Sequence, residues 1–294
     1  MAALAVKPGG RYVDGTLGRA GHARAVVERG GTVLGIDRDD QALAEVAAMG
    51  LDGIVAVKGE HADLKALANA HGWEKVDGIL LDLGVSSPQL DDAERGFSFL
   101  RDGPLDMRMD PSRGKSAADV VNESSADELR RIFREYGEEQ QASRIANGIV
   151  RERAHKSFST TKDLADFIER LVGRHGGHHP ATRVFQALRM EVNDEMGQLQ
   201  RALEGGMGLL APGGRFAVIT FESLTDRVVK RFFAAHVGKM ESLIQGGEKW
   251  VGELPRALAV SKRAITAGER EISENPRSRS AKLRAIEIER EVAA

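Results

Sequence analysis

Two carboxylates, Asp14 and Asp37, are spaced so that they could bind one nucleoside-containing cofactor. Asp14 closes a predicted strand and precedes the loop Gly15-x-x-Gly18-x-x-Gly21, and Asp37 closes the next predicted strand 23 residues after Asp14. Glycines let a backbone approach a ligand closely. A carboxylate about 20 residues beyond such a loop can accept hydrogen bonds from both hydroxyls of a ribose. The spacing therefore predicts a cofactor site that includes Asp14, Gly18 and Asp37.

NAD and S-adenosylmethionine compete as the ligand of this site. A dinucleotide site prefers G-x-G-x-x-G, because the pyrophosphate must lie almost against the backbone. Here the glycines are three residues apart and follow an acid, Asp14. A carboxylate would repel a pyrophosphate and attract the amino group of a methionine moiety. The pattern favours S-adenosylmethionine over NAD, and over a strand-turn-helix without a ligand.

The elements that must position these residues form an alternating strand and helix pattern. Strands are predicted at 12–13, 32–36, 54–57 and 76–82, with helices at 23–28, 40–49 and 63–71 between them. His61 and Asp82 follow the third and fourth strands. Ligands of open α/β sheets lie outside the carboxyl ends of the strands. We therefore expect Asp14, Asp37, His61 and Asp82 along one edge of a sheet.

Charge and composition exclude several classes of protein. The 294 residues carry a net charge of −2, so no global imbalance indicates a nucleic-acid partner. The segment 144–189 has nine Lys or Arg and four Asp or Glu residues, a local charge of +5, which suits either a solvated helical face or RNA. The absence of cysteine excludes disulfides, thiolate zinc sites and cysteine nucleophiles. No long apolar run or signal peptide is evident, so we expect a cytoplasmic location.

The alternation stops between 91 and 196. Helices are predicted at 126–136, 138–154, 161–172 and 182–205, and the sheet resumes with strands at 215–221, 257–261 and 284–289 and a helix at 225–236. We interpret 96–199 as an inserted helical substrate-recognition domain. Residues 1–95 and 200–294 then form the cofactor-binding domain.

Six segments resemble one known family in the same order along the chain. They are Asp14-Gly-Thr-Leu-Gly-Arg-Ala-Gly-His22, Asp82-Leu-Gly-Val-Ser-Ser-Pro-Gln-Leu-Asp91, Arg95-Gly-Phe-Ser-Phe99, Pro104-Leu-Asp-Met-Arg-Met-Asp110, Arg183-Val-Phe-Gln-Ala-Leu-Arg189 and the stretch 275–284. Together they resemble the bacterial 16S ribosomal RNA (cytosine-N4) methyltransferases, the RsmH or MraW family. A chain of segments in order is far more specific than a glycine loop.

The resemblance implies an α/β fold of the class I S-adenosylmethionine-dependent methyltransferases: a Rossmann-like, seven-stranded, mostly parallel sheet with an inserted all-helical subdomain. It implies methylation of a cytidine in the decoding region of the small ribosomal subunit. It also implies cofactor contacts at Ala20, Gly21, His22, Asp37, His61, Asp82 and Gln89. Three features depart from the family: a further N-terminal segment with a His-x-Pro-Val-type motif is missing, His61 replaces phenylalanine, and Thr220-Phe-Glu-Ser223 replaces Ser-Phe-His-Ser.

The candidate catalytic residues are Asp82, Asp106 and Asp110. Without cysteine, methylation at C5 of cytosine is unavailable, which leaves transfer to nitrogen or oxygen. The exocyclic amine of cytosine is a poor nucleophile, so the site must accept hydrogen bonds from it and orient it. We expect Asp82 to contact the cofactor and Asp106 or Asp110 to engage the cytosine. Either of the last two is equally suited to capping a turn.

We expect 16S rRNA within the small ribosomal subunit as the partner, with no membrane and no metal, and a homodimer remains open. Phe97 or Phe99 could stack on a flipped base. Phosphate contacts are expected from basic residues: Arg108, Arg183, Arg277, Arg279, Lys282 and Arg284. A charged surface turn is the ordinary explanation for the last four. The alternative functions are an NAD-dependent oxidoreductase and a non-catalytic ribosome-binding protein.

Overall fold

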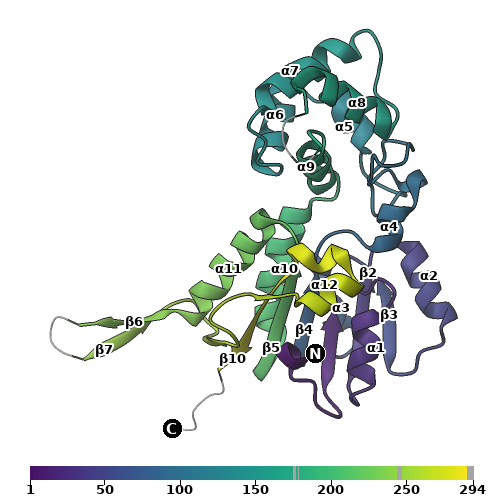
Figure 1. Ribbon diagram of the computed structural model, residues 1–294. Coiled ribbons are helices and arrows are strands. Elements are labelled where there is room, and N and C mark those ends of the chain that lie inside the picture. The colour runs from purple at the N-terminus through teal and green to yellow at the C-terminus, as the bar shows by residue number, and fades with distance from the viewer. Residues whose placement is uncertain (175–176, 178, 244–246, 290–294) are drawn as a thin grey trace. The chain divides into compact units, whose positions relative to one another are not determined.

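A computed structural model describes residues 1–174, 177, 179–243 and 247–289 (Figure 1). Contacts between residues divide the chain into two compact units. Unit 1 comprises Met1–Gly84 and Gly197–Ala294, and unit 2 comprises Val85–Met196. Unit 2 is therefore an insertion in the sequence of unit 1. Its role in substrate recognition stays a prediction.

Unit 1 is built on an eight-stranded sheet in the order β3-β2-β1-β4-β5-β10-β8, with β9 beside β10. The strands are β1 (Arg11–Asp14), β2 (Thr32–Asp37), β3 (Ile54–Lys58), β4 (Val76–Asp82), β5 (Leu210–Thr220), β8 (Ala257–Ala259), β9 (Ile265–Thr266) and β10 (Lys282–Ile288). The five neighbouring strands β3, β2, β1, β4 and β5 pair in parallel. Strand β10 is antiparallel to β5, β8 and β9. The Rossmann-like α/β fold is confirmed, with the two-residue β9 as an addition to the expected seven strands.

The order of the sheet explains why β1 and β4 matter most for a ligand. The chain proceeds from β1 to β2 and β3 on one side, and it returns to β4 and β5 on the other. Such a switch point opens a crevice at the carboxyl ends of the strands, where ligands of doubly wound sheets bind. Asp14 and Asp82 end the two strands that flank this point.

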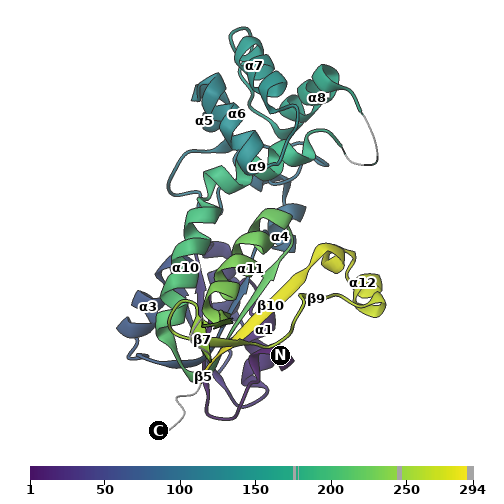
Figure 2. The same cartoon turned by 90° about the vertical axis from the view of Figure 1, so that its left-hand side faces the viewer.

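Helices cover both faces of the sheet, because successive strand residues point to opposite sides. They are α1 (Gly21–Val27), α2 (Asp40–Ala48), α3 (Leu64–Ala70), α10 (Glu195–Leu209) and α11 (Ser223–Val237). Unit 1 also contains α12 (Glu269–Glu274), which has no buried residue, and the 3-10 turns η1 (Ala2–Leu4), η2 (His61–Asp63) and η4 (Pro276–Ser280). Val13 joins a core with α3, α10 and α11, whereas Tyr12 joins a core with α1 and α2. Figure 2 shows α10 and α11 beside β5, and Gly206 of α10 faces the Phe216 ring of β5 so closely that a Cβ would lie 2.4 Å from it.

A hairpin of β6 (Lys239–Ser242) and β7 (Glu248–Val251) projects from unit 1 (Figure 1). The sequence interpretation did not include it, because its exposed strands lack the buried alternation on which strand prediction depends.

Unit 2 is helical and has its own core. Its elements are α4 (Ser87–Asp91), η3 (Ala93–Arg95), α5 (Ala117–Glu123), α6 (Ala126–Glu135), α7 (Ala142–Arg153), α8 (Thr161–Val172) and α9 (Thr182–Val192). The prediction of one helix over 182–205 is wrong: α9 ends before Asp194, which has a φ of +47°. The predicted start at 138 is also wrong, because Glu138 adopts a φ of +48° and α7 begins at Ala142. None of the described helices is long and apolar enough to cross a membrane.

Candidate functional site

Thr16 joins the ends of β1 and β4 in unit 1. Its hydroxyl accepts a hydrogen bond from the Asp82 amide at 2.7 Å and lies 3.4 Å from Asp14 Oδ1, to which it can donate. Asp14 Oδ1 also accepts a hydrogen bond from the Thr16 amide at 3.1 Å. Sequence reasoning did not single out Thr16, although a threonine two residues after an aspartate is a recognisable turn signal.

The remaining oxygens of these two carboxylates are the most unusual polar atoms of the site. Asp14 Oδ2 and Asp82 Oδ1 are buried, and neither forms a hydrogen bond with any residue that the structure describes. Burial raises the pKa of Asp14 to about 6, although the nearby His22 opposes the shift. Burying a carboxylate oxygen without a donor costs free energy. Two such oxygens at the switch point indicate a ligand that supplies donors.

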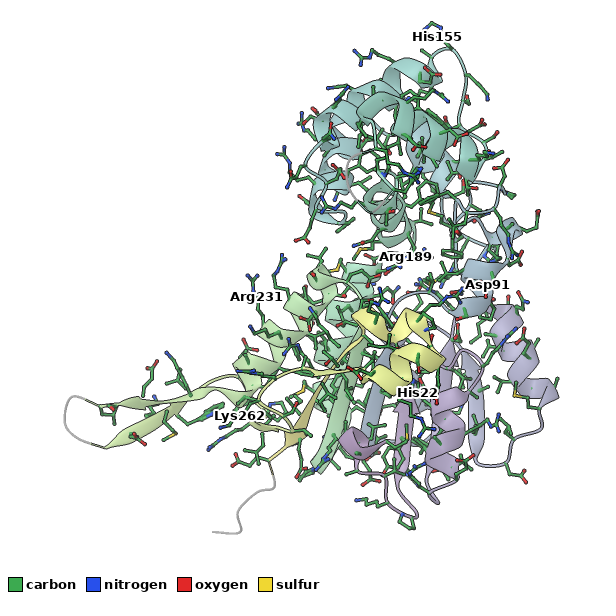
Figure 3. The ribbon with its side chains drawn as sticks, in the orientation of Figure 1. His22, Asp91, His155, Arg189, Arg231 and Lys262 are labelled. Atoms are coloured by element: carbon green, nitrogen blue, oxygen red, sulfur yellow. The ribbon has the colours of Figure 1, made fainter. Side chains whose placement is uncertain are left out.

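His22 (labelled in Figure 3) belongs to the first turn of α1 and pairs with the second oxygen of Asp82. Its Nε2 lies 3.3 Å from Asp82 Oδ2. This hydrogen bond raises the pKa of His22, although burial opposes the rise. The pair leaves Asp82 with one oxygen held by His22 and the other turned to a ligand.

The three glycines of the loop differ in what a side chain at each position would meet. A Cβ at Gly15 would lie 2.5 Å from the Leu81 side chain, so this glycine allows strand ends to pack. Gly18 has a φ of +48° and donates its amide hydrogen to Asp37 Oδ2 at 2.8 Å. A Cβ at Gly21 would meet open space, and the buried Ala20 before it caps α1 at a φ of +58°. The loop therefore shapes the site through packing as much as through close approach to a ligand.

Asp37 ends β2 and is held by two backbone amides. Gly18 donates to its Oδ2 at 2.8 Å, and Asp39 donates to its Oδ1 at 2.9 Å. Burial raises the pKa of Asp37, and both hydrogen bonds oppose that rise. Each carboxylate oxygen keeps a further lone pair, so this fixed carboxylate can still accept hydrogen bonds from ribose hydroxyls.

His61 opens η2 after β3, beside the glycine loop. Its Cβ lies 3.2 Å from where a Cβ at Gly15 would be. Gln198 of α10, which sequence reasoning missed, holds the neighbours of His61 through hydrogen bonds to the Glu60 side chain and the Ala62 amide. We call Asp14, Asp37, His61 and Asp82 the strand-end rim. S-adenosylmethionine fits these acceptors, because its ammonium can donate to the carboxylate oxygens that have no partner among the described residues, and its ribose hydroxyls can donate to Asp37.

Gln89 lies in unit 2, where its side chain has a structural partner. Its side-chain Oε1 accepts a hydrogen bond from the backbone N–H of Ser86 at 3.0 Å, and the backbone N–H of Gln89 donates to Ser86 Oγ at 3.4 Å. This reciprocal arrangement is a capping box that begins α4. A cofactor contact by Gln89 stays a prediction.

Asp106 and Asp110 both stabilise the segment 104–110 of unit 2, which we call the 104–110 loop. Asp106 accepts two hydrogen bonds from the Arg108 guanidinium, at 2.9 and 2.6 Å. Burial alone would raise the pKa of Asp106, but the bonds from Arg108 outweigh it and hold that pKa below its ordinary value. Asp110 accepts from the Ser112 hydroxyl at 2.6 Å and pairs with Arg113 at 3.1 Å. Both aspartates also accept the amide hydrogen two residues on, as turn-capping aspartates do.

Asn193 fastens the 104–110 loop to α9. Its Oδ1 accepts the Met109 amide hydrogen at 2.9 Å, and its Nδ2 donates to the carbonyls of Met107 at 2.8 Å and Arg189 at 2.9 Å. Met107 is fully buried with a φ of +64°, a conformation that costs free energy unless the surroundings impose it. Asn193 supplies part of that constraint and was not recognised from the sequence.

The residues proposed for RNA in unit 2 differ in exposure. Phe97 is 7% exposed and belongs to the core, so it offers no free face to a base. Phe99 is half-buried against His179 and Phe185, with ring centroids 4.7 and 4.8 Å away. Arg183 is exposed, whereas the guanidinium of Arg108 is committed to Asp106. Arg183 is therefore the better phosphate candidate of the two arginines.

The basic stretch near the end of unit 1 is only partly available to phosphates. Arg284 Nε and Lys282 Nζ lie 2.7 and 3.4 Å from the carboxylate of Asp226 on α11. Asp226 neutralises part of their charge, and their expected contacts with RNA phosphates stay a prediction. Arg277 and Arg279 in η4 are exposed.

Comparisons with known proteins identify the family. The model of the MraW methylase family matches residues 1–289. A protein of Methylococcus capsulatus named "Ribosomal RNA small subunit methyltransferase H" is 50% identical over 292 residues, covering 97% of this chain and 96% of its own length. A protein of the same name from Deinococcus radiodurans is 53% identical over 233 residues, covering 79% of this chain and 74% of its own.

A solved rRNA methylase of Streptococcus thermophilus is 10% identical, covers 98% of this chain and 92% of its own, and has a TM-score of 0.43, too slight a likeness to argue from. The family match and the two curated relatives are sufficient without it. From these matches and the site, we conclude that S-adenosylmethionine is the cofactor and that the chain belongs to the MraW methylase family.

Proposed function

We propose that this protein transfers a methyl group from S-adenosylmethionine to N4 of a cytidine in the decoding region of 16S rRNA in the small ribosomal subunit, in the cytoplasm. The observation that carries the proposal is the pair of buried carboxylate oxygens on Asp14 and Asp82, which accept no hydrogen bond from the part of the chain that the structure describes, within a chain of this family. The names of the two curated relatives support ribosomal RNA of the small subunit as the substrate.

The strand-end rim divides the work of holding the cofactor. Asp14 and Asp82 bind the ammonium of its methionine part, which satisfies their two free oxygens. Asp37 binds the ribose hydroxyls, and Gly18 keeps that carboxylate in place. Bound S-adenosylmethionine supplies an electrophilic methyl group on a sulfonium sulfur.

Unit 2 supplies the candidates for holding the base. The lone pair of the cytosine amine is delocalised into the ring, so a hydrogen-bond acceptor and a fixed orientation are needed, the latter worth roughly 7 to 11 kcal/mol. Asp106 is the better acceptor because it is ionised and about a quarter exposed, whereas the Asp110 side chain is 7% exposed. Phe99 rather than Phe97 remains as the stacking ring.

The test is methyl transfer to small subunits isolated from a strain that lacks the modification. With methyl-labelled S-adenosylmethionine, we expect one labelled nucleoside in 16S rRNA, and chromatography should identify it as N4-methylcytidine. Label at another atom would overturn the proposed specificity. Tight cofactor binding without transfer to any subunit preparation would instead support the non-catalytic alternative.

Membership of a methylase family disfavours the NAD-dependent alternative. Calorimetric titration with both ligands checks this directly, and we expect heat from S-adenosylmethionine only. The homodimer stays a prediction, which light scattering of the purified protein can test.

A further inference from the structure

Gln198 is a buried polar residue on an otherwise apolar face of α10. It is 3% exposed, and its helix neighbours Leu199, Ala202 and Leu203 join the core of unit 1. A buried amide costs free energy unless its donor and acceptor are both satisfied. A leucine would pack here without that requirement. The presence of glutamine therefore calls for a reason beyond packing of the helix.

Both ends of the Gln198 side chain are used by one short segment of chain. Its Nε2 donates to the carboxylate of Glu60, and its Oε1 accepts the Ala62 amide hydrogen at 3.3 Å. Glu60 and Ala62 flank His61. The amide of Gly59, the residue before this segment, donates to the Asp37 carbonyl at 2.9 Å. The segment 60–62 is thus fixed from two sides, by α10 and by the end of β2.

The order of the sheet places this segment relative to the rest of the strand-end rim. Asp82, Asp14, Asp37 and the 60–62 segment follow β4, β1, β2 and β3, which are consecutive neighbours in the sheet. If Asp14 and Asp82 take the ammonium and Asp37 takes the ribose, the nucleobase lies beyond Asp37, on the β3 side. This step rests on the proposed function of the rim.

We propose that Gln198 is a positioning residue for cofactor binding: it holds the segment 60–62 in the conformation that receives the nucleobase of S-adenosylmethionine. Gln198 acts through Glu60 and Ala62. Without its amide, Glu60 loses a donor and the Ala62 amide loses an acceptor, so the segment around His61 loses its support from α10 and can rearrange. The cost should appear in the affinity for the adenosine part of the ligand.

The first experiment replaces the amide by a side chain of similar size, Gln198→Met, in the full-length protein. Titration calorimetry should show about tenfold weaker binding of S-adenosylmethionine, the effect of losing one to two hydrogen bonds. The affinity for adenosine, used as a second probe, should fall by a similar factor. In the methyl-transfer assay KM for S-adenosylmethionine should rise more than kcat falls.

Gln200→Met is the matched control. Gln200 lies on the same helix, is exposed, and pairs only with Glu204 of α10 at 3.1 Å among the described residues. Its substitution should leave both affinities unchanged. A lower melting temperature for Gln198→Met with cofactor affinity within twofold of the wild type would overturn the proposal, because it would show a purely structural role.

A reciprocal exchange keeps the proposal testable even if Gln198→Met does not fold. Gln198→Glu alone opposes two carboxylates and should weaken binding, whereas Glu60→Gln combined with Gln198→Glu restores a donor and an acceptor in reversed order and should recover most of the affinity. Equal affinities for the single and double variants would overturn the proposal. Failure of the wild type to bind S-adenosylmethionine would instead count against the proposed function.

Discussion

The strand-end rim of unit 1 and the 104–110 loop of unit 2 both depend on aspartates, but the hydrogen bonds and ion pairs of these carboxylates differ between the two regions. Asp14 and Asp82 each keep a buried oxygen that no described residue contacts through a hydrogen bond. Asp106 and Asp110 are paired with arginines two or three residues away. The rim retains binding capacity at a cost in stability, whereas the loop uses its acids to hold its own shape.

Neutralising a rim acid gives the largest expected effect. Asp14→Asn removes the charge that binds the ammonium, and we expect about a hundredfold loss of affinity for S-adenosylmethionine, ~3 kcal/mol. Calorimetry measures this directly. Asp52→Asn, at an exposed position of the same unit, should leave affinity unchanged. A loss below threefold in Asp14→Asn would remove the rim from the proposed role.

The same substitution should stabilise unit 1 above pH 6. The folded pKa of Asp14, about 6, exceeds its ordinary 3.8. The stability that Asp14 contributes in its protonated form is therefore fully present below pH 3.8 and is lost as the pH rises through 6. The whole change in the free energy of unfolding is about 3 kcal/mol. Urea unfolding followed by the fluorescence of Trp73 and Trp250 should show that gain for Asp14→Asn at pH 8 and little at pH 4. No gain at pH 8 would contradict the cost assigned to the rim.

Removing the support of the loop should destabilise unit 2 alone. Asn193→Ala removes the Asn193 acceptor of the Met109 amide hydrogen and the Asn193 donor to the Met107 carbonyl, both in the interior, which should cost about 2 to 3 kcal/mol. Circular dichroism should report the loss, while tryptophan fluorescence should not change, because both tryptophans belong to unit 1. Asn147→Ala, on the exposed face of α7, is the control. Equal effects of both variants would show that the hydrogen bonds of Asn193 contribute nothing.

Neutralising an aspartate of the 104–110 loop should lower the free energy of unfolding, whereas neutralising Asp14 should raise it. Asp106→Asn weakens a bidentate pair with Arg108 whose side chains are about a quarter exposed, so we expect a loss of roughly 1 kcal/mol. Affinity for S-adenosylmethionine should stay the same while methyl transfer falls. Increased stability of this variant would erase the distinction between the two regions.

The smallest effect concerns the basic residues near β10. Log affinity for small subunits falls as log salt concentration rises. Replacing Arg277 and Arg279 by glutamate should make this slope shallower by roughly 1 to 2. Lys282→Ala should change the slope less, because Asp226 already balances its charge. Filter binding at several salt concentrations compares them. A larger change for Lys282→Ala would reverse our ranking.

The position of the rim residues at the ends of neighbouring strands could be predicted, because strand ends are recognisable from short stretches of sequence. Apolar runs such as 76–82 define the strands, and the aspartates that end them necessarily meet at one edge once the strands are parallel. The resemblance supplied the fold class, and the match of the MraW family over residues 1–289 confirms the family.

The partners of buried polar groups could not be predicted, because they come from distant parts of the chain. Gln198 contacts Glu60 across 138 positions, and Asp226 contacts Arg284 across 58. No glycine or proline marks the break between α9 and α10 in the sequence. The left-handed residue at this break is Asp194. Phe97 was assigned to RNA for its type alone, and only packing shows that it belongs to the core.

The separation of the hydrophobic clusters has a consequence for how the protein denatures. The cluster of unit 2 and the side chains packed on it lie between Val85 and Val192, and the two clusters of unit 1 draw on the chain before and after that interval. Two cores that share no side chain need not unfold as one cooperative transition. A scanning calorimeter should then record two endotherms, and only the one belonging to unit 1 should move to higher temperature when S-adenosylmethionine is added.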